Sequence, residues 1–171
     1  MNTTVRRART ADVRSIRQLV DQYAAERILL SKEMVTLYED VQEFWVAEEP
    51  AGAIIGCGAL HVMWEDLAEV RTLATHPDWM GRGIGHTVLS TLLDVARDLG
   101  ISRVFCLTFE VDFFKRHGFE VVEGNVVPPE VYAELLRSDD EGVAEFLDLD
   151  RVKRNTLGNT RMLLRLSESA C

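Results

Sequence analysis

The sequence is poor in cysteine and has no pattern that would put cysteine to use. Cys57, Cys106 and Cys171 form no Cys-x-x-Cys pair and no cluster with histidine, so neither a disulfide framework nor a zinc site is expected. Cys57 and Cys106 stand within apolar runs, which predicts small buried side chains in a reducing compartment. A chain of 171 residues can bury roughly 70% of its unfolded surface without covalent cross-links.

Long apolar runs and an excess of basic charge are also missing. No apolar stretch approaches the roughly 18 residues of a membrane span, and the N-terminal "MNTTVRRARTADV" lacks the apolar core of a secretory signal. We therefore expect a cytoplasmic protein with no membrane partner. The net charge of −9 and the pI near 4.9 argue against nucleic acid as a main partner. A small ligand stays open, because a basic pocket can lie in an acidic surface.

The composition is that of an ordinary globular protein, with 47% apolar and 27% charged residues. The length suggests one domain over residues 1–171, and there is no internal repeat and no linker long enough to divide the chain. The acidic segment "DDEGVAEFLDLD" lacks the ligand spacing of an EF-hand loop. We expect it to be a solvated face with Val143, Phe146 and Leu147 turned inward.

Apolar spacing predicts strands and helices in a mixed order. Strands are expected at residues 5–9, 43–48, 53–64, 68–75, 102–109, 119–124 and 161–166. Helices are expected at residues 11–25, within 29–42, and at 84–99, 110–117 and 128–138. Thr10 offers an N-cap to the first helix. The run at 102–109 is almost continuously apolar, which indicates a central strand buried on both faces.

A glycine-rich loop separates the strand at 68–75 from the helix at 84–99. Gly81, Gly83 and Gly85 occupy three of five consecutive positions. A helix N-terminus has unpaired N–H groups and the positive end of the helix dipole, and glycines let a phosphate approach them closely. Arg82 adds a cation. Residues 80–86 are therefore a candidate pyrophosphate site, and a plain glycine-rich turn is the alternative.

The spacing in this loop fits neither of two common phosphate-binding motifs. A P-loop needs Gly-Lys-Ser/Thr where this chain has Gly-His-Thr, and the Rossmann pattern needs G-x-G-x-x-G. The wider order of segments instead resembles the Gcn5-related N-acetyltransferase (GNAT) superfamily. "EVRTLAT", His76-Pro77, "GRGIG", a long helix, "VFCLTF" and "FFKRHGF" follow one another as they do in that family.

The resemblance runs from "VRRAR" to the last strand and implies the family's α/β (α+β) fold. That fold is a mixed central sheet of about seven strands, flanked by helices, with a splay after a bulged fourth strand. It further implies that acetyl-CoA is the co-substrate and that no metal is needed. The Leu73 N–H would donate to the thioester carbonyl, and the backbone of Leu73 and Thr75 would pair with pantetheine. The loop residues implied to bind the pyrophosphate are Met80, Gly81, Arg82, Gly83, Ile84, Gly85 and His86, with Met80 standing where the family usually has Gln or Arg.

Two positions bear on catalysis. Glu69 matches a glutamate that some family members use as the base that deprotonates the acceptor amine. The alternative is a structural glutamate paired with Arg71 or a neighbouring strand. Phe114 stands where the family often has a tyrosine that protonates the departing thiolate. A thiol of pKa near 8.5 can leave without such an acid, and amino-acid acetyltransferases of the arginine pathway also tend to have phenylalanine there.

The acceptor is suggested by "ILLSKEMVTLYEDVQEFWVAE" and "NTLGNTRMLL", which resemble N-acetylglutamate synthases, the second segment those of the short actinobacterial type. The resemblance implies acetyl transfer to the α-amine of L-glutamate, or of L-glutamine, as the first step of arginine biosynthesis. It leaves a homodimer open. The residues implied to bind the acceptor are Lys32, Arg71, Asn159, Thr160 and Arg161. Each could equally be a surface charge or a turn residue, and His61 could face the acceptor or the core.

Two further functions stay open from the sequence. The first is acetylation of another amine, such as a protein N-terminus, a polyamine or an antibiotic, and the acidic composition would suit a cationic acceptor. The second is a non-catalytic acyl-CoA-binding module, which the missing tyrosine would fit and Glu69 argues against. Cationic side chains around the acceptor favour a dicarboxylate, whereas carboxylates there favour a polyamine.

Overall fold

A computed structural model describes residues 3–25, 32–147 and 158–167 of the chain. Cys171 and the first residues of the helix expected within 29–42 lie outside these ranges. The described strands form one mixed sheet of seven in the order β1-β2-β3-β4-β5-β7-β6, as the family resemblance predicts. The strands are β1 (Thr4–Arg7), β2 (Phe44–Glu48), β3 (Ile54–Trp64), β4 (Leu67–Thr75), β5 (Arg103–Thr108), β6 (Glu120–Val121) and β7 (Thr160–Arg165). The helices are α1 (Val13–Ala25), α2 (Met34–Glu39), α3 (Ile84–Asp98), α4 (Val111–Arg116), α5 (Pro129–Leu135) and α6 (Glu141–Phe146).

The chain divides into two compact units. The first comprises Met1–His61 and Val70–Gly100, and the second comprises Val62–Glu69 and Ile101–Cys171. Strands β3 and β4 each contribute residues to both units. The single domain over residues 1–171 stays a prediction.

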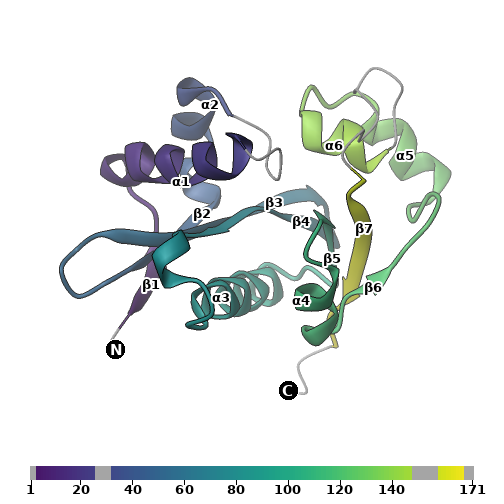
Figure 1. Ribbon diagram of the computed structural model, residues 1–171. Coiled ribbons are helices and arrows are strands. Elements are labelled where there is room, and N and C mark those ends of the chain that lie inside the picture. The colour runs from purple at the N-terminus through teal and green to yellow at the C-terminus, as the bar shows by residue number, and fades with distance from the viewer. Residues whose placement is uncertain (1–2, 26–31, 148–157, 168–171) are drawn as a thin grey trace. The chain divides into compact units, whose positions relative to one another are not determined.

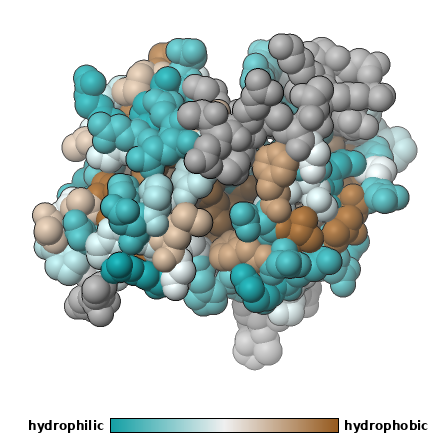
Figure 2. All heavy atoms as spheres, in the orientation of Figure 1, coloured by the Kyte–Doolittle hydropathy of each residue, from teal (hydrophilic) through white to brown (hydrophobic). Residues whose placement is uncertain are grey.

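In the first unit, helices cover both faces of the sheet (Figure 1). Helices α1 and α2 lie on one face and α3 lies on the other. The core under α1 and α2 takes apolar residues from five elements, namely Val13, Ile16, Leu19, Val20, Leu37, Phe44, Val46, Cys57, Ala59 and Ala74. Figure 2 shows hydrophilic residues gathered over the outer side of α1, as expected of an amphipathic helix.

Helix α3 packs closely on β3 because β3 carries two glycines. A Cβ at Gly56 would stand 2.7 Å from Ile84 Cγ2, and a Cβ at Gly58 would stand 3.0 Å from both Val88 and Leu92. Side chains at these positions would push the helix away from the sheet. The glycines therefore fix where α3 begins, and with it the position of the loop that precedes α3.

In the second unit, β5 is the strand buried on both faces, as its apolar run predicts. It pairs in parallel with β4 through Leu67–Arg103, Ala68–Val104 and Glu69–Phe105, and antiparallel with β7 along its whole length. Helices α5 and α6 lie together over one face (Figure 1). There Phe105 and Phe146 meet edge to face, with ring centroids 4.8 Å apart.

Three details differ from the sequence expectations. Thr10 does not cap α1, because it starts a 3₁₀ turn (Thr10–Asp12) in which Asp12 accepts a hydrogen bond from the Arg9 N–H at 2.7 Å. The acidic segment contains a helix, α6, that was not expected, although Val143, Phe146 and Leu147 are buried as predicted. The strand expected at 119–124 is reduced to the two residues of β6. Among the residues that the structure describes, no helix is long and apolar enough to cross a membrane.

Candidate active site

The glycine loop presents bare backbone at the start of α3. Gly83 is the N-cap of α3 with φ of 81°, and Gly81 has φ of 73°. A Cβ at either residue would have no atom within 4 Å, so the backbone there faces open space. The first N–H groups of α3 have no acceptor within the helix. This arrangement fits an anion such as a pyrophosphate.

Met80 and Arg82 of the loop are exposed, whereas Ile84 is buried. The Arg82 guanidinium lies 5.0 Å from the centre of the Trp79 ring, where it can serve a bound phosphate from the loop surface. Met80, which stands where the family usually has Gln or Arg, is 61% exposed. Its side chain therefore makes few packing contacts. His76 shapes the turn before the loop, because its Nδ1 accepts a hydrogen bond from the Asp78 N–H at 3.3 Å.

Strand β4 is interrupted at Thr72, which has φ of 58°. It is the one non-glycine residue with positive φ in the described part of the chain, and such a left-handed residue fits the expected bulge. The Cys57 thiol donates to the Thr72 carbonyl at 3.6 Å. Burial raises the pKa of this thiol to about 12, so it stays protonated and keeps its role as donor. Cys57 and Cys106 are both buried and free, as predicted.

Beyond the bulge, the backbone N–H and C=O groups of Leu73 and Thr75 point toward the edge of β4 that faces away from β3. The His76 N–H bonds to the Ile55 carbonyl on β3 at 2.8 Å. Backbone groups alternate between the two sides of an antiparallel strand, so those of Thr75 and Leu73 point away from β3. The Tyr23 hydroxyl donates to the Thr75 carbonyl. Leu73 and Thr75 thus have the orientation that pairing with an extended amide chain requires.

Four charged side chains and His61 gather near one another in the first unit. The Lys32 ammonium lies 3.8 Å from the Asp40 carboxylate, and His61 Nδ1 lies 2.7 Å from Glu43 Oε1. Burial raises the pKa of Asp40 and the charge of Glu43 raises it further, while Lys32, His61 and Arg71 act in the opposite direction. The two candidate acceptor ligands Lys32 and Arg71 are therefore in one group, which also contains two carboxylates.

Glu69 and Phe114 belong to the second unit. Glu69 is only 4% exposed and stands opposite Phe105 in the β4–β5 pairing. Its charge adds to burial, the larger cause, in raising the pKa of Cys106. Phe114 is buried between Phe113 and Phe119, with ring centroids 5.2 and 5.1 Å away.

Arg161 uses its terminal donors within the second unit. Its guanidinium donates to the Phe146 carbonyl at 2.6 Å and to the Gly124 carbonyl at 2.9 Å, and Cζ lies 5.6 Å from the centre of the Phe105 ring. A cation at the C-terminal end of α6 is stabilised by the helix dipole. Arg161 Nε and Asn159 Oδ1 are buried without a hydrogen-bond partner. Asn159 directly precedes β7, and Thr160 is the first residue of that strand. A substrate at these three positions would meet an arginine whose terminal N–H groups already donate to backbone carbonyls.

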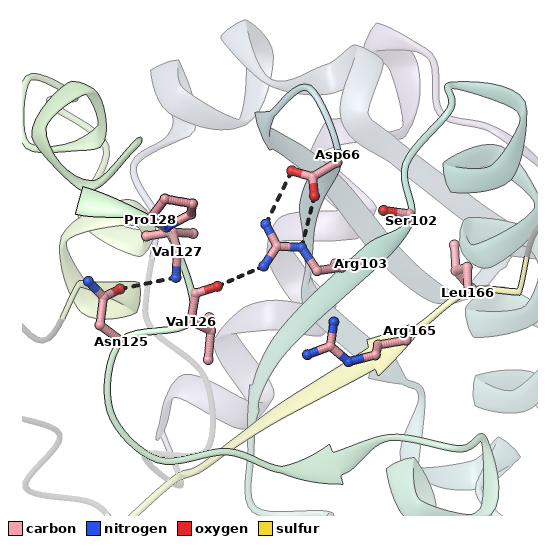
Figure 3. A pocket seen from close by; sticks show the side chains of 9 residues that line it. All are labelled: Asp66, Ser102, Arg103, Asn125, Val126, Val127, Pro128, Arg165 and Leu166. Carbon is pink, nitrogen blue, oxygen red and sulfur yellow. Dashed lines mark hydrogen bonds and ion pairs between the residues drawn. The ribbon is translucent and has the colours of Figure 1, made fainter. Parts of the chain in front are cut away.

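One hollow of the second unit is lined by other residues. Its volume is about 770 Å³, and Figure 3 shows the side chains that line it. Arg103 extends into it, but its guanidinium already donates to Asp66 at 2.9 and 3.2 Å and to the Val126 carbonyl at 2.7 Å. None of the candidate site residues lines this hollow. We therefore assign it no part in the chemistry.

Sequence reasoning missed three residues around the candidate site. Tyr23 packs against the core of the first unit, and its hydroxyl reaches β4. Asp40 and Glu43 belong to no motif that the sequence shows. Their partners lie eight and 18 residues away, beyond the i,i+3 and i,i+4 spacings at which side chains of one helix pair. In the described residues, no group of three His, Cys, Asp or Glu side chains is placed to hold a metal ion.

Comparison with known proteins places the chain in a family. Residues 11–119 match the Acetyltransferase (GNAT) family, and the chain belongs to it. The chain is 62% identical over 164 residues to an amino-acid acetyltransferase of Mycobacterium tuberculosis, covering 95% of this chain and 94% of that protein. An amino-acid acetyltransferase of Shewanella oneidensis is 32% identical over 72% of this chain, which spans only 28% of that longer protein.

Solved structures agree with the family assignment. The crystal structure of Rv2747 from Mycobacterium tuberculosis in complex with CoA and NLQ is 61% identical to this chain, with a TM-score of 0.92 over 96% of this chain and 99% of that one. N-acetylglutamate synthase from Neisseria gonorrhoeae, complexed with coenzyme A and N-acetyl-glutamate, has a TM-score of 0.77 at 24% identity. It covers 98% of this chain and 36% of the other, and at that identity it supports the fold alone.

Proposed function

We propose that this protein is an amino-acid N-acetyltransferase that transfers acetyl from acetyl-CoA to the α-amine of L-glutamate, with L-glutamine as the second candidate acceptor. The observation that carries the proposal is the bare backbone of the glycine loop at the start of α3. Gly81 and Gly83 leave open space where a pyrophosphate would approach. The high identity to an amino-acid acetyltransferase over almost the whole chain adds support.

In this proposal, acetyl-CoA supplies the thioester whose acetyl group is transferred. The N–H groups of Met80 to His86 bind the pyrophosphate, aided by the Arg82 cation. The backbone of Leu73 and Thr75 pairs with the pantetheine amides. The Leu73 N–H donates to the thioester carbonyl oxygen, which becomes more negative as the amine attacks, and a fixed donor aimed at that oxygen stabilises the transition state.

Glu69 is proposed to take the proton of the acceptor ammonium, because only the neutral amine is nucleophilic. The amine nitrogen then forms a bond to the acetyl carbon as the carbon–sulfur bond breaks. The CoA thiolate leaves without a tyrosine acid, since Phe114 has no hydroxyl, and takes its proton from solvent. Lys32 and Arg71 are proposed to neutralise acceptor carboxylates, with Asn159, Thr160 and Arg161 as further candidates.

A second candidate acceptor is a cationic amine such as a polyamine. It is favoured by one observation, the presence of Asp40 and Glu43 beside Lys32 and Arg71. Carboxylates in an acceptor site would attract a second ammonium group. The net balance of this charged group therefore decides between a dicarboxylate and a polyamine.

The test is a panel of acceptors with acetyl-CoA, read by release of the free CoA thiol. It contains the twenty amino acids, spermidine and a peptide with a free N-terminus. We expect the highest kcat/KM with L-glutamate or L-glutamine. Activity with spermidine alone would select the polyamine, and activity with the peptide alone would select a protein N-terminus. CoA binding with no release for any acceptor would leave a binding module.

The proposed place of action is the cytoplasm, with a small-molecule substrate and no nucleic-acid or membrane partner. The buried free thiols of Cys57 and Cys106 suit a reducing compartment. Light scattering during size-exclusion chromatography separates a monomer from the homodimer that the family resemblance leaves open.

A further inference from the structure

The hydroxyl of Tyr23 joins two segments that are far apart in the chain. It donates a hydrogen bond to the Thr75 carbonyl, 52 residues away. Tyr23 stands near the end of α1, and its ring packs against the core of the first unit. Thr75 is the last residue of β4. The bond therefore ties the end of β4 to a helix that is itself fixed by core packing.

The Tyr23–Thr75 hydrogen bond lies at the junction of β4 and the glycine loop. Two hydrogen bonds hold Thr75 and His76, one on each side of the strand. The His76 N–H bonds to the Ile55 carbonyl on β3, while the Thr75 carbonyl points away from β3 and meets Tyr23. The 3₁₀ turn at Pro77–Trp79 and the loop follow at once. The position of this junction sets how far the β4 edge lies from the N–H groups of α3.

We propose that Tyr23 is a positioning residue that holds the pantetheine-binding edge of β4 in register with the glycine loop. The inference rests on the proposed function, since it assumes that one ligand spans both segments. A strand edge binds an extended amide chain through fixed N–H and C=O groups. The Thr75 carbonyl has two lone pairs, so Tyr23 can hold it while the Thr75 N–H and the backbone of Leu73 stay directed at the ligand.

The consequence is a difference between two ligands. CoA carries both the pyrophosphate and the pantetheine arm. Adenosine 3′-phosphate 5′-diphosphate carries the pyrophosphate and the nucleoside but lacks the arm. A residue that keeps β4 in register with the loop affects the first ligand and not the second. A residue needed only for general stability affects both alike.

The experiment is isothermal titration of the whole chain and of its Tyr23→Phe variant with each ligand. Removing one hydroxyl leaves the ring packing in place. We expect the Kd for CoA to rise about two- to tenfold, which corresponds to one lost hydrogen bond, and the Kd for adenosine 3′-phosphate 5′-diphosphate to stay unchanged. In steady-state assays the KM for acetyl-CoA should rise, with the KM for the acceptor unchanged.

The matched control is Tyr38→Phe, because Tyr38 is 41% exposed on α2. It should leave both titrations unchanged. Equal losses for both ligands in Tyr23→Phe would reduce Tyr23 to a structural residue and overturn the proposal. Unchanged or tighter CoA binding would do the same. A wild-type protein that binds neither ligand would instead refute the proposed function, so the two failures are distinct.

Discussion

The ammonium group of Lys32 lies 3.8 Å from the carboxylate of Asp40. Lys32 is the candidate ligand for an acceptor carboxylate. Its ammonium group already pairs with a carboxylate of the protein itself. At this separation the pair is an ion pair without a close hydrogen bond. A substrate carboxylate can therefore replace Asp40 as the partner of the Lys32 ammonium. The roles of Lys32 and Asp40 need separate tests.

Lys32→Ala should weaken the acceptor and spare the co-substrate. A charge-assisted hydrogen bond is lost, so the KM for L-glutamate should rise about tenfold or more, while the KM for acetyl-CoA stays nearly constant. Initial rates with each substrate varied in turn measure both constants. Lys115→Ala, on the exposed side of α4, is the control. An unchanged KM for L-glutamate would remove Lys32 from the acceptor site.

Asp40→Asn should raise the thermal stability at neutral pH. Burial, and then the charge of Glu43, raise the pKa of Asp40 in the folded protein. The folded state then binds this proton more tightly than the unfolded state. The ionised carboxylate thus costs stability above the folded-state pKa, and the cost vanishes below the unfolded pKa of about 3.9.

Calorimetry at pH 7 and near pH 4 measures this effect. The Tm of Asp40→Asn should exceed that of the wild type at pH 7, and the difference should shrink at the lower pH. Asp94→Asn changes a carboxylate on the surface of α3 that pairs with Arg97 and should show no such gain. A lower Tm for Asp40→Asn at pH 7 would mean that the pairing with Lys32 outweighs burial.

Glu69→Gln tests the proposed base. The change keeps the shape of the side chain and removes its basicity, so kcat at pH 7 should fall by about 10²–10⁴. The loss should shrink as the pH approaches the pKa of the acceptor amine, where neutral amine is abundant. The pH profile of kcat measures both effects, with the exposed Glu65→Gln as control. A wild-type kcat at pH 7 would return Glu69 to a structural role.

Gly83→Ala tests the phosphate site, and Gly100→Ala is its control at the other end of α3. Both glycines have φ of 81°, and a Cβ at either would meet no atom within 4 Å. Both variants should therefore lose similar stability, about 1–2 kcal/mol. Only Gly83→Ala places a methyl group in the path of a phosphate. Acetyl-CoA should raise the Tm of the wild type and of Gly100→Ala, and much less that of Gly83→Ala.

Phe114→Tyr should yield no gain in kcat and a lower Tm. The added hydroxyl would be buried among the rings of Phe113 and Phe119, where an unpaired polar group costs about 1–3 kcal/mol. Tyr38→Phe and Tyr132→Phe should each lower kcat by less than about tenfold, below the effect of a positioned general acid. A larger loss in one folded variant with normal CoA binding would identify such an acid.

Local patterns predicted the parts of the fold that depend on neighbouring residues. The helix expected at 84–99 and the continuous apolar run of β5 follow from residues a few positions apart, and both are confirmed. Helix α6 was missed because its six residues lie in an acidic segment. Its buried face, Val143 and Phe146, is stabilised by contact with Phe105 and Leu163, and neither of these is near it in sequence.

The sequence by itself determined the family motif, the glycine loop and the candidate base Glu69, because each is a matter of residue type and short spacing. Tertiary structure decided which charges meet, placing Lys32 beside Asp40 and committing Arg161 to the carbonyls of Phe146 and Gly124. It also placed β7 between β5 and β6 and set Thr72 in a left-handed conformation. The physical reason is that such contacts join residues beyond the reach of local patterns, eight positions apart for Lys32 and Asp40 and 15 and 37 positions apart for the Arg161 bonds. Their energies depend on the packing of whole elements, which no local pattern contains.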